Sequence, residues 1–209
     1  DNDLLNIAIT SSASFEIGKI VSDAYFQVRD KFAIKIKENT NSLTEVVHQK
    51  GYLFETILAS NLFFTDKNEV ELENVYLLII NNYLVDIEQI ALFINEALNK
   101  NKSLIVLADD YSDDIINNIL ALNSEQNEKI YLLKIPEYGK NKLDLLNDLE
   151  LISNCKIIND LNNIDLYFLG EVNGLKLTNE ESIIYFTENN NIKEKIKELR
   201  YLIKDNLVK

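Results

Sequence analysis

Between Val75 and Ser153, three runs rich in apolar residues alternate with three segments in which apolar residues recur every three or four positions. The apolar runs predict strands at 75–80, 103–108 and 129–135, and the periodic segments predict helices at 86–99, 112–123 and 142–153. Strands that are apolar nearly throughout and alternate with helices are typical of a parallel sheet covered on both faces. The pattern therefore predicts an α/β fold with a mostly parallel sheet flanked by helices.

The segments on either side of this region follow other patterns. Apolar spacing predicts an amphipathic helix over 14–30, and the alternating residues Ala33–Lys37 predict a strand, so the N-terminal segment is expected to be a small α+β unit. Gly51 separates it from the α/β region. Short strands and a final charged helix are predicted further along, at 166–177, 182–186 and 192–203.

Composition and charge exclude several classes of function. With 34 acidic residues against 21 Lys and Arg and a net charge of −13, the chain is not expected to bind nucleic acid or anionic lipid. No apolar run approaches the roughly 18 residues of a membrane span, and the N-terminus does not resemble a signal peptide. One cysteine and one histidine exclude a disulfide framework and a zinc site built from these residues, and fit a reducing compartment.

The sequence contains no methionine, even at position 1, so we expect it to be part of a longer or processed protein.

Few residues suggest catalysis. The chain has no glycine-rich phosphate-binding motif, and no nucleophile motif accompanies His48, which we expect to be solvated or near a hinge. Cys155 precedes a short apolar segment and is expected to be a buried thiol. Asp109 and Asp110 follow a predicted strand, where carboxylates could bind Mg²⁺. The same two acids are also compatible with a solvated loop that leads into a capped helix.

The helices predicted at 86–99 and 112–123 carry more apolar residues than one sheet face requires. At about 100° per residue, the apolar positions of each helix cover roughly 160°, whereas a helix lying on a sheet buries a stripe of about 100°. The positions beyond that stripe are Ala91, Ile94, Ile116 and Leu120. Either a thicker core or an oligomer contact covers them, or the two helices form a groove that binds apolar peptide segments.

Five short motifs occur in order along the chain. They are Ile17–Ile20 (IGKI), Val70–Ile80 (VELENVYLLII), Asn101–Asp110 (NKSLIVLADD), Lys134–Gly139 (KIPEYG) and Leu145–Leu149 (LLNDL). Each motif is short, but their order resembles the apical domain of GroEL-type group I chaperonins with the adjoining part of the intermediate domain. The resemblance implies that residues 1–50 are part of the intermediate domain and that residues 51–209 form the apical domain.

The resemblance also implies a binding site and a hinge. The family's groove for substrate and co-chaperonin falls on three residues of an extended segment and five residues of two helices, namely Leu58, Leu62, Phe63, Ala91, Ile94, Ile116, Leu120 and Ala121. Gly51 falls on the hinge between the two domains. The implied partners are unfolded polypeptides, a GroES-type co-chaperonin and the other subunits of a homo- or hetero-oligomeric ring.

The implied function is protein folding by an ATP-driven ring in the bacterial cytoplasm or in the interior of an organelle. ATP and Mg²⁺ would bind to other parts of the full-length protein, and no catalytic residue, cofactor or metal is expected in these residues. Two alternatives stay open. One is an α/β enzyme that uses Asp109 and Asp110 on a small ligand or a metal. The other is a structural ring subunit with a degenerate groove, because Leu58 and Leu62 stand where the family has tyrosines.

Overall fold

The computed structural model describes residues 2–28, single positions between 34 and 47, and residues 50–64, 69–125 and 129–207. The chain divides into two compact units, Asp1–Gln49 and Lys50–Lys209. The predicted strand Ala33–Lys37 and the residue His48 fall largely or wholly outside the described residues.

The first unit contains helices α1 (Asn2–Ser12) and α2 (Phe15–Val28). The two helices pack closely where Gly18 meets Ile9, because a Cβ atom on Gly18 would lie 2.7 Å from the Ile9 backbone. Ser22, one turn after Gly18, is also buried. Small residues on one face of α2 thus allow the backbones to approach.

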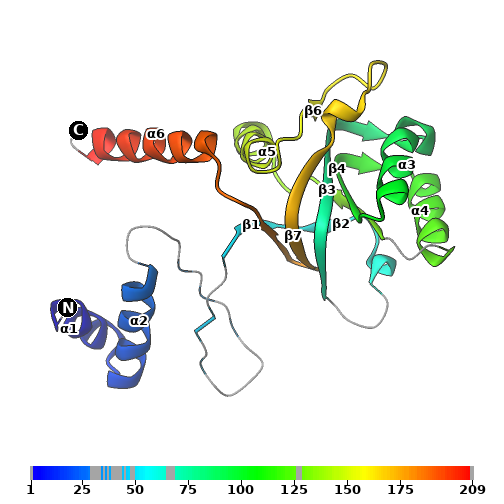
Figure 1. The fold of residues 1–209 in the computed structure, drawn as a ribbon. Helices are drawn as coiled ribbons and strands as arrows, with labels where there is room; N and C mark the ends of the chain where they lie inside the picture. Colours follow the sequence, from blue (N-terminus) through cyan, green and yellow to red (C-terminus); the bar gives the residue numbers. More distant parts are fainter. Residues whose placement is uncertain are drawn as a thin grey trace. The chain divides into compact units, whose positions relative to one another are not determined.

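The second unit is built on one eight-stranded mixed sheet (Figure 1). The strand order is β1-β8-β7-β3-β4-β5-β2, and β6 pairs with β3 outside this path. The strands are β1 (Tyr52–Glu55), β2 (Ile57–Leu58), β3 (Glu69–Leu84), β4 (Leu104–Tyr111), β5 (Ile130–Lys134), β6 (Ile157–Ile158), β7 (Gly170–Thr178) and β8 (Glu181–Tyr185). The helices are η2 (Asn61–Phe63), η3 (Ile87–Gln89), α3 (Ala91–Lys100), α4 (Asp113–Glu125), α5 (Gly139–Ser153), η4 (Leu166–Phe168) and α6 (Asn190–Leu207), where η denotes a 3₁₀ helix.

The predicted α/β fold is confirmed, and the sheet has two different halves. Strands β3, β4 and β5 pair in parallel, as the apolar runs predict, and the short strand β6 also pairs in parallel with β3. Strands β7, β8 and β1 extend the sheet in antiparallel fashion from β3, and β2 joins the opposite edge antiparallel to β5. The long strand β3 takes part in both halves. Its first residues alternate between exposed and half-buried, whereas Leu77–Ile80 are all buried.

Helices α3 and α4 cover one face of the parallel half, and α5 covers the other (Figure 1). Consecutive crossovers from β3 to β4 and from β4 to β5 place α3 and α4 on the same face, because such connections share one handedness. The chain then returns through α5 to β6, beside β3. The buried core lies between these three layers.

Local signals explain where several helices begin. The predicted helix 86–99 starts as the 3₁₀ turn η3, because Asp86 and Gln89 form a capping box, and only then continues as α3. The Ser112 hydroxyl accepts a hydrogen bond from the Ile115 backbone N–H at 3.4 Å and so caps the start of α4. Helix α1 and the short strands β1 and β2 have no counterpart among the predicted elements.

Candidate functional site

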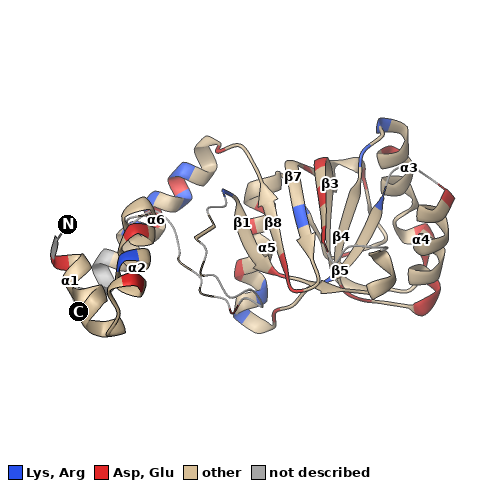
Figure 2. Ribbon diagram, turned by 90° about the horizontal axis from the view of Figure 1, so that it is seen from below, with Lys and Arg blue, Asp and Glu red and all other residues tan. Residues whose placement is uncertain are grey.

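Helices α3 and α4 lie side by side (Figures 1 and 2). Part of the apolar surface of each helix is accessible. On α3 and the residue before it, the side chains against the sheet are Ile90, Phe93, Ile94 and Ala97. On α4 they are Ile115, Ile119 and Asn123. Asn123 is satisfied there because its amide donates to the Ile130 carbonyl at 2.8 Å and accepts from the Ile130 N–H at 2.9 Å.

The prediction that Ile94 lacks a core partner is wrong. Its side chain is only 5% exposed and belongs to the core. On a helix with about 100° per residue, Phe93, Ile90 and Ile94 together span about 100°, which is the width that a sheet buries. Ile94 therefore lies at the margin of the buried stripe, while Ala91 lies beyond it.

The accessible apolar residues of the two helices form a surface that we call the two-helix surface. Ala91, Ile116 and Leu120 are half-buried, and Ala121 is exposed. Leu92 is also 40% exposed and belongs to this surface, although the sequence did not single it out. Helical spacing alone could have predicted this exposure, because Leu92 lies about 200° around the helix from Ile90 and cannot face the same sheet. The two-helix surface thus comprises Ala91, Leu92, Ile116, Leu120 and Ala121.

The three residues of the extended segment that were expected to complete the site lie in three different environments. Leu58 is half-buried on the edge strand β2, which pairs with β5. Leu62 is 72% exposed on η2, whereas Phe63 is 7% exposed and its ring centroid lies 6.2 Å from that of Tyr131. Leu62 is thus available to a partner. Phe63 belongs to the core, so a direct contact with a ligand is not expected of it in this conformation.

Gly51 immediately precedes β1 and lies next to the boundary between the two units. Its φ of +153° is rare for residues with a side chain, and a Cβ atom would lie 2.7 Å from the Ile184 carbonyl oxygen of the paired strand β8. The local packing and the backbone conformation therefore both require a glycine at position 51.

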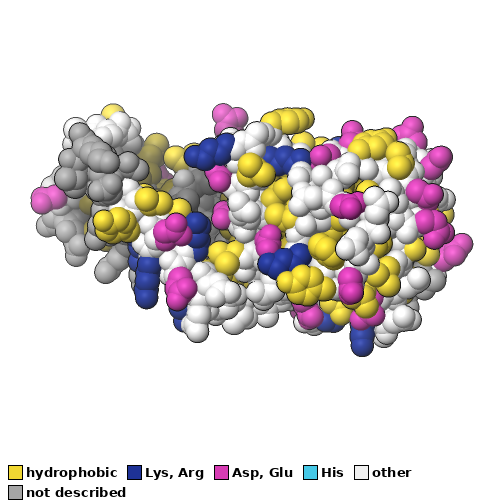
Figure 3. Space-filling view, turned by 90° about the horizontal axis from the view of Figure 1, so that it is seen from above, with side chains coloured by type: hydrophobic (Ala, Val, Ile, Leu, Met, Phe, Trp, Pro, Cys, Tyr) yellow, Lys and Arg dark blue, Asp and Glu magenta, His cyan; other side chains and the backbone are white. Residues whose placement is uncertain are grey.

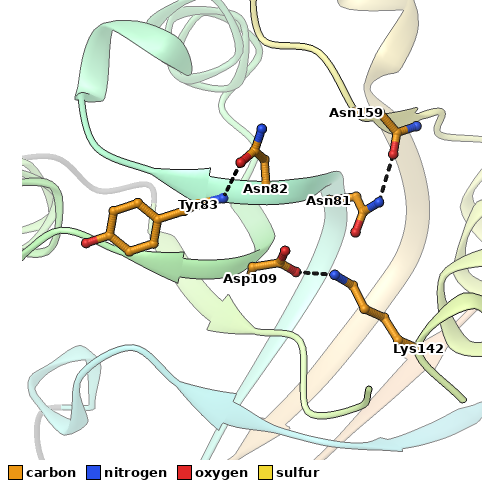
Figure 4. A network of polar contacts seen from close by, with 6 residues as sticks. All are labelled: Asn81, Asn82, Tyr83, Asp109, Lys142 and Asn159. Carbon is orange, nitrogen blue, oxygen red and sulfur yellow. Dashed lines mark hydrogen bonds and ion pairs between the residues drawn. The ribbon is translucent and has the colours of Figure 1, made fainter. Parts of the chain in front are cut away.

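The two acids considered as metal ligands are engaged by lysines (Figure 4 shows Asp109). Asp109 accepts from the Lys142 ammonium at 2.5 Å, and Asp110 lies 2.7 Å from that of Lys134. The hydrogen bond from Lys134 is the main cause that lowers the pKa of Asp110, and the Tyr111 N–H adds to it. Each carboxylate is thus neutralised from a neighbouring element.

Asparagine amides surround this edge of the sheet (Figure 4). The Asn81 amide donates to the Asn159 side-chain oxygen at 2.8 Å, which joins the ends of β3 and β6. Asn82 accepts from the Tyr83 backbone N–H at 2.8 Å. The first contact links β3 to the residue after β6, the second lies within β3, and each of the three amides has at least one partner.

Cys155 is buried, which confirms the prediction of a buried thiol, and burial is the main cause that raises the pKa of this thiol to about 11. Within the described residues, no group of three or more His, Cys, Asp or Glu side chains could hold a metal ion. No helix among the described residues is both long and apolar enough to span a membrane.

The chain is similar in sequence to a curated chaperonin. No family model matches the chain. Over 153 residues it is 28% identical to Chaperonin GroEL of Acholeplasma laidlawii (strain PG-8A), an alignment that covers 72% of this chain and 28% of the relative. The chain thus spans under a third of the length of that curated relative.

A solved chaperonin structure is also similar to this one. The chaperonin gp146 from the bacteriophage EL 2 (Pseudomonas aeruginosa) matches with a TM-score of 0.62 and 18% identity, over 99% of this chain and 42% of the other. This match concerns the fold. With the sequence match, it confirms the resemblance to GroEL-type chaperonins.

Proposed function

We propose that residues 51–209 act as the apical domain of a chaperonin and bind hydrophobic segments of unfolded proteins. The observation that carries the proposal is the two-helix surface, where Leu92 and Ala121 are exposed and Ile116 and Leu120 are half-buried on two adjacent helices. Exposed apolar residues gathered on neighbouring helices are typical of interaction sites. Leu62 and Leu58 would add contacts from the extended segment.

Two of the residues that the resemblance assigned to the groove are buried and do not belong to the proposed contact surface. Phe63 and Ile94 are buried in the core, so they would not contact the client directly. Direct contacts with the client would come from the two-helix surface, which consists of Ala91, Leu92, Ile116, Leu120 and Ala121. Each aliphatic side chain buried against a client would contribute at most about 1.5–3 kcal/mol before entropic costs.

We propose the same domain division for the chain as the resemblance implies. Residues 1–50 would belong to an intermediate domain, and the compact unit that begins at Lys50 supports this division. Gly51 would act as the hinge, since its position beside the boundary suits a residue that absorbs backbone rotation. Rotation there would expose the apolar residues in one state of the ring and cover them in another.

The remaining parts of the proposal concern the whole protein. ATP and Mg²⁺ would bind outside these 209 residues, which lack a phosphate-binding glycine loop. A GroES-type co-chaperonin would compete with clients for the two-helix surface, and other subunits would complete a homo- or hetero-oligomeric ring. The protein would act in the bacterial cytoplasm or inside an organelle.

A double substitution at exposed positions tests the binding surface. We expect Leu92→Glu with Ala121→Glu to weaken binding of a chemically denatured model protein at least roughly tenfold, because two carboxylates would enter the apolar contact. The measurement is fluorescence anisotropy of the labelled denatured protein. Both sites are exposed, so circular dichroism and thermal unfolding should be unchanged.

The matched control is Leu143→Glu with Leu166→Glu. These leucines are 56% and 38% exposed on α5 and η4, so the control adds the same charge at similar exposure. Equal binding by the control, the double variant and the parent chain would contradict the proposed surface. Binding of a GroES-type mobile-loop peptide then separates a working groove from the structural-subunit alternative, which predicts no peptide binding.

A further inference from the structure

Acidic side chains border the two-helix surface. From Asp86 through α3, and along α4, the sequence has six acids and one lysine, Lys100. Helix α4 itself has no basic residue. Figure 2 shows red segments on α4, and Figure 3 shows acidic side chains along the end of the molecule where α3 and α4 lie. The surface is thus apolar at its centre and anionic at its margin.

The acids lie within one helical turn of the apolar contacts. Glu96 follows Leu92 by four residues on α3. On α4, Asp113 precedes Ile116 by three residues and Glu125 follows Ala121 by four. Residues three or four apart are neighbours on a helix surface, so a client that touches the apolar side chains passes close to these carboxylates.

Within the part of the chain that the structure describes, these carboxylates have no basic partner. Asp113, Asp114 and Glu125 are exposed, and among the described residues no ion pair engages them or Glu96. In contrast, Asp109 and Asp110 at the end of β4 are each matched by a lysine. The charge at the margin of the two-helix surface is therefore left for a partner to neutralise.

We infer that this surface selects apolar segments flanked by Lys or Arg. The inference rests on the proposed function and adds the chemistry of the client. A cation beside the apolar segment gains attraction from several unpaired carboxylates, whereas an acidic flank is repelled, and this difference contributes mainly to selectivity and association rate. Because the carboxylates are exposed, salt reduces the effect.

Three peptides with one apolar core test the inference. They carry Lys, Ser or Glu residues on both flanks, and their binding to the 209-residue chain is measured by fluorescence anisotropy. At an ionic strength of about 0.03 M, we expect the Lys-flanked peptide to bind roughly fivefold more tightly than the Ser-flanked peptide and the Glu-flanked peptide to bind more weakly. At about 0.5 M, the three affinities should converge.

A triple variant locates the charge responsible. Asp113→Asn, Asp114→Asn and Glu125→Gln together should remove most of the Lys advantage and leave the affinity of the Ser-flanked peptide unchanged. The control is Glu73→Gln, Asp144→Asn and Glu188→Gln, which changes the net charge equally at exposed positions outside α3 and α4. Thermal unfolding checks both variants, because Asp113 and Asp114 also complement the dipole of α4.

The outcomes separate the inference from the proposed function. If the Ser-flanked peptide binds and Lys flanks give no advantage, or if both triple variants lose the advantage equally, the inference is overturned and the binding surface stands. If no peptide binds the folded chain, the proposed function itself fails. A Lys advantage that only the first triple variant removes supports the inference.

Discussion

Replacing Ile94 with glutamate is expected to unfold the second unit or leave it only marginally stable. The Ile94 side chain is 5% exposed among the core residues of α3, so the substitution would bury a carboxylate without a partner. We expect a loss of about 4 kcal/mol or more in the free energy of unfolding. Urea denaturation followed by circular dichroism measures this loss.

Leu92→Glu is the matched control on the same helix. Leu92 is 40% exposed, so its carboxylate would stay hydrated, and we expect a change of less than about 1 kcal/mol. A stable Ile94→Glu variant would show that Ile94 does not face the core. The comparison also shows why loss of client binding in an Ile94 variant would say nothing about the binding surface.

The second large effect is expected at Gly170, the first residue of β7. A Cβ atom there would lie 2.6 Å from the Cys155 Cβ and 2.7 Å from both the Cys155 nitrogen and the Ser153 carbonyl oxygen. Two of these atoms belong to the backbone and cannot rotate away. We expect Gly170→Ala to destabilise the second unit by about 3 kcal/mol, through a displaced backbone after α5.

Two further variants separate steric contact from backbone conformation. Gly139→Ala meets no atom within 4 Å and has φ of +57°, so we expect only about 1 kcal/mol of strain. Cys155→Gly combined with Gly170→Ala should not restore stability, because the backbone contacts remain. Full recovery in that double variant would mean that the Cys155 side chain alone requires the glycine.

The parallel half of the sheet could be predicted because the apolar pattern of each strand matches its burial on both faces. Strands β3, β4 and β5 are buried on both faces, so their apolar runs are continuous, and helices of ten or more residues separate them. Strands β1 and β2 have four and two residues. Such short segments contain too few positions for a periodic signal, and their pairing depends on β8 and β5, which lie far away in the sequence.

The candidate site was only partly predictable. Helical periodicity identified Ala91, Ile116 and Leu120 as lying beyond the buried stripe, and the structure leaves them half-exposed. The same argument misplaced Ile94, because the direction in which a helix faces its sheet can shift by tens of degrees. Leu92 was missed for a different reason: it lies about 200° from Ile90, on the side of the helix away from the apolar arc that the periodicity defined. A residue at the margin of a stripe is buried or exposed according to the tilt of the helix, which the helix sequence does not encode.

The α/β class, the order of the central elements, the apolar excess on α3 and α4 and the acidic charge beside it all follow from the amino-acid sequence without knowledge of the packing. These properties depend on residue types at short spacing, where burial and helix geometry act locally. Tertiary packing was needed to establish that Ile94 and Phe63 are buried while Leu92 and Leu62 are accessible, and that lysines engage Asp109 and Asp110. These outcomes depend on which distant segments pack together, and packing between elements is fixed by the whole chain.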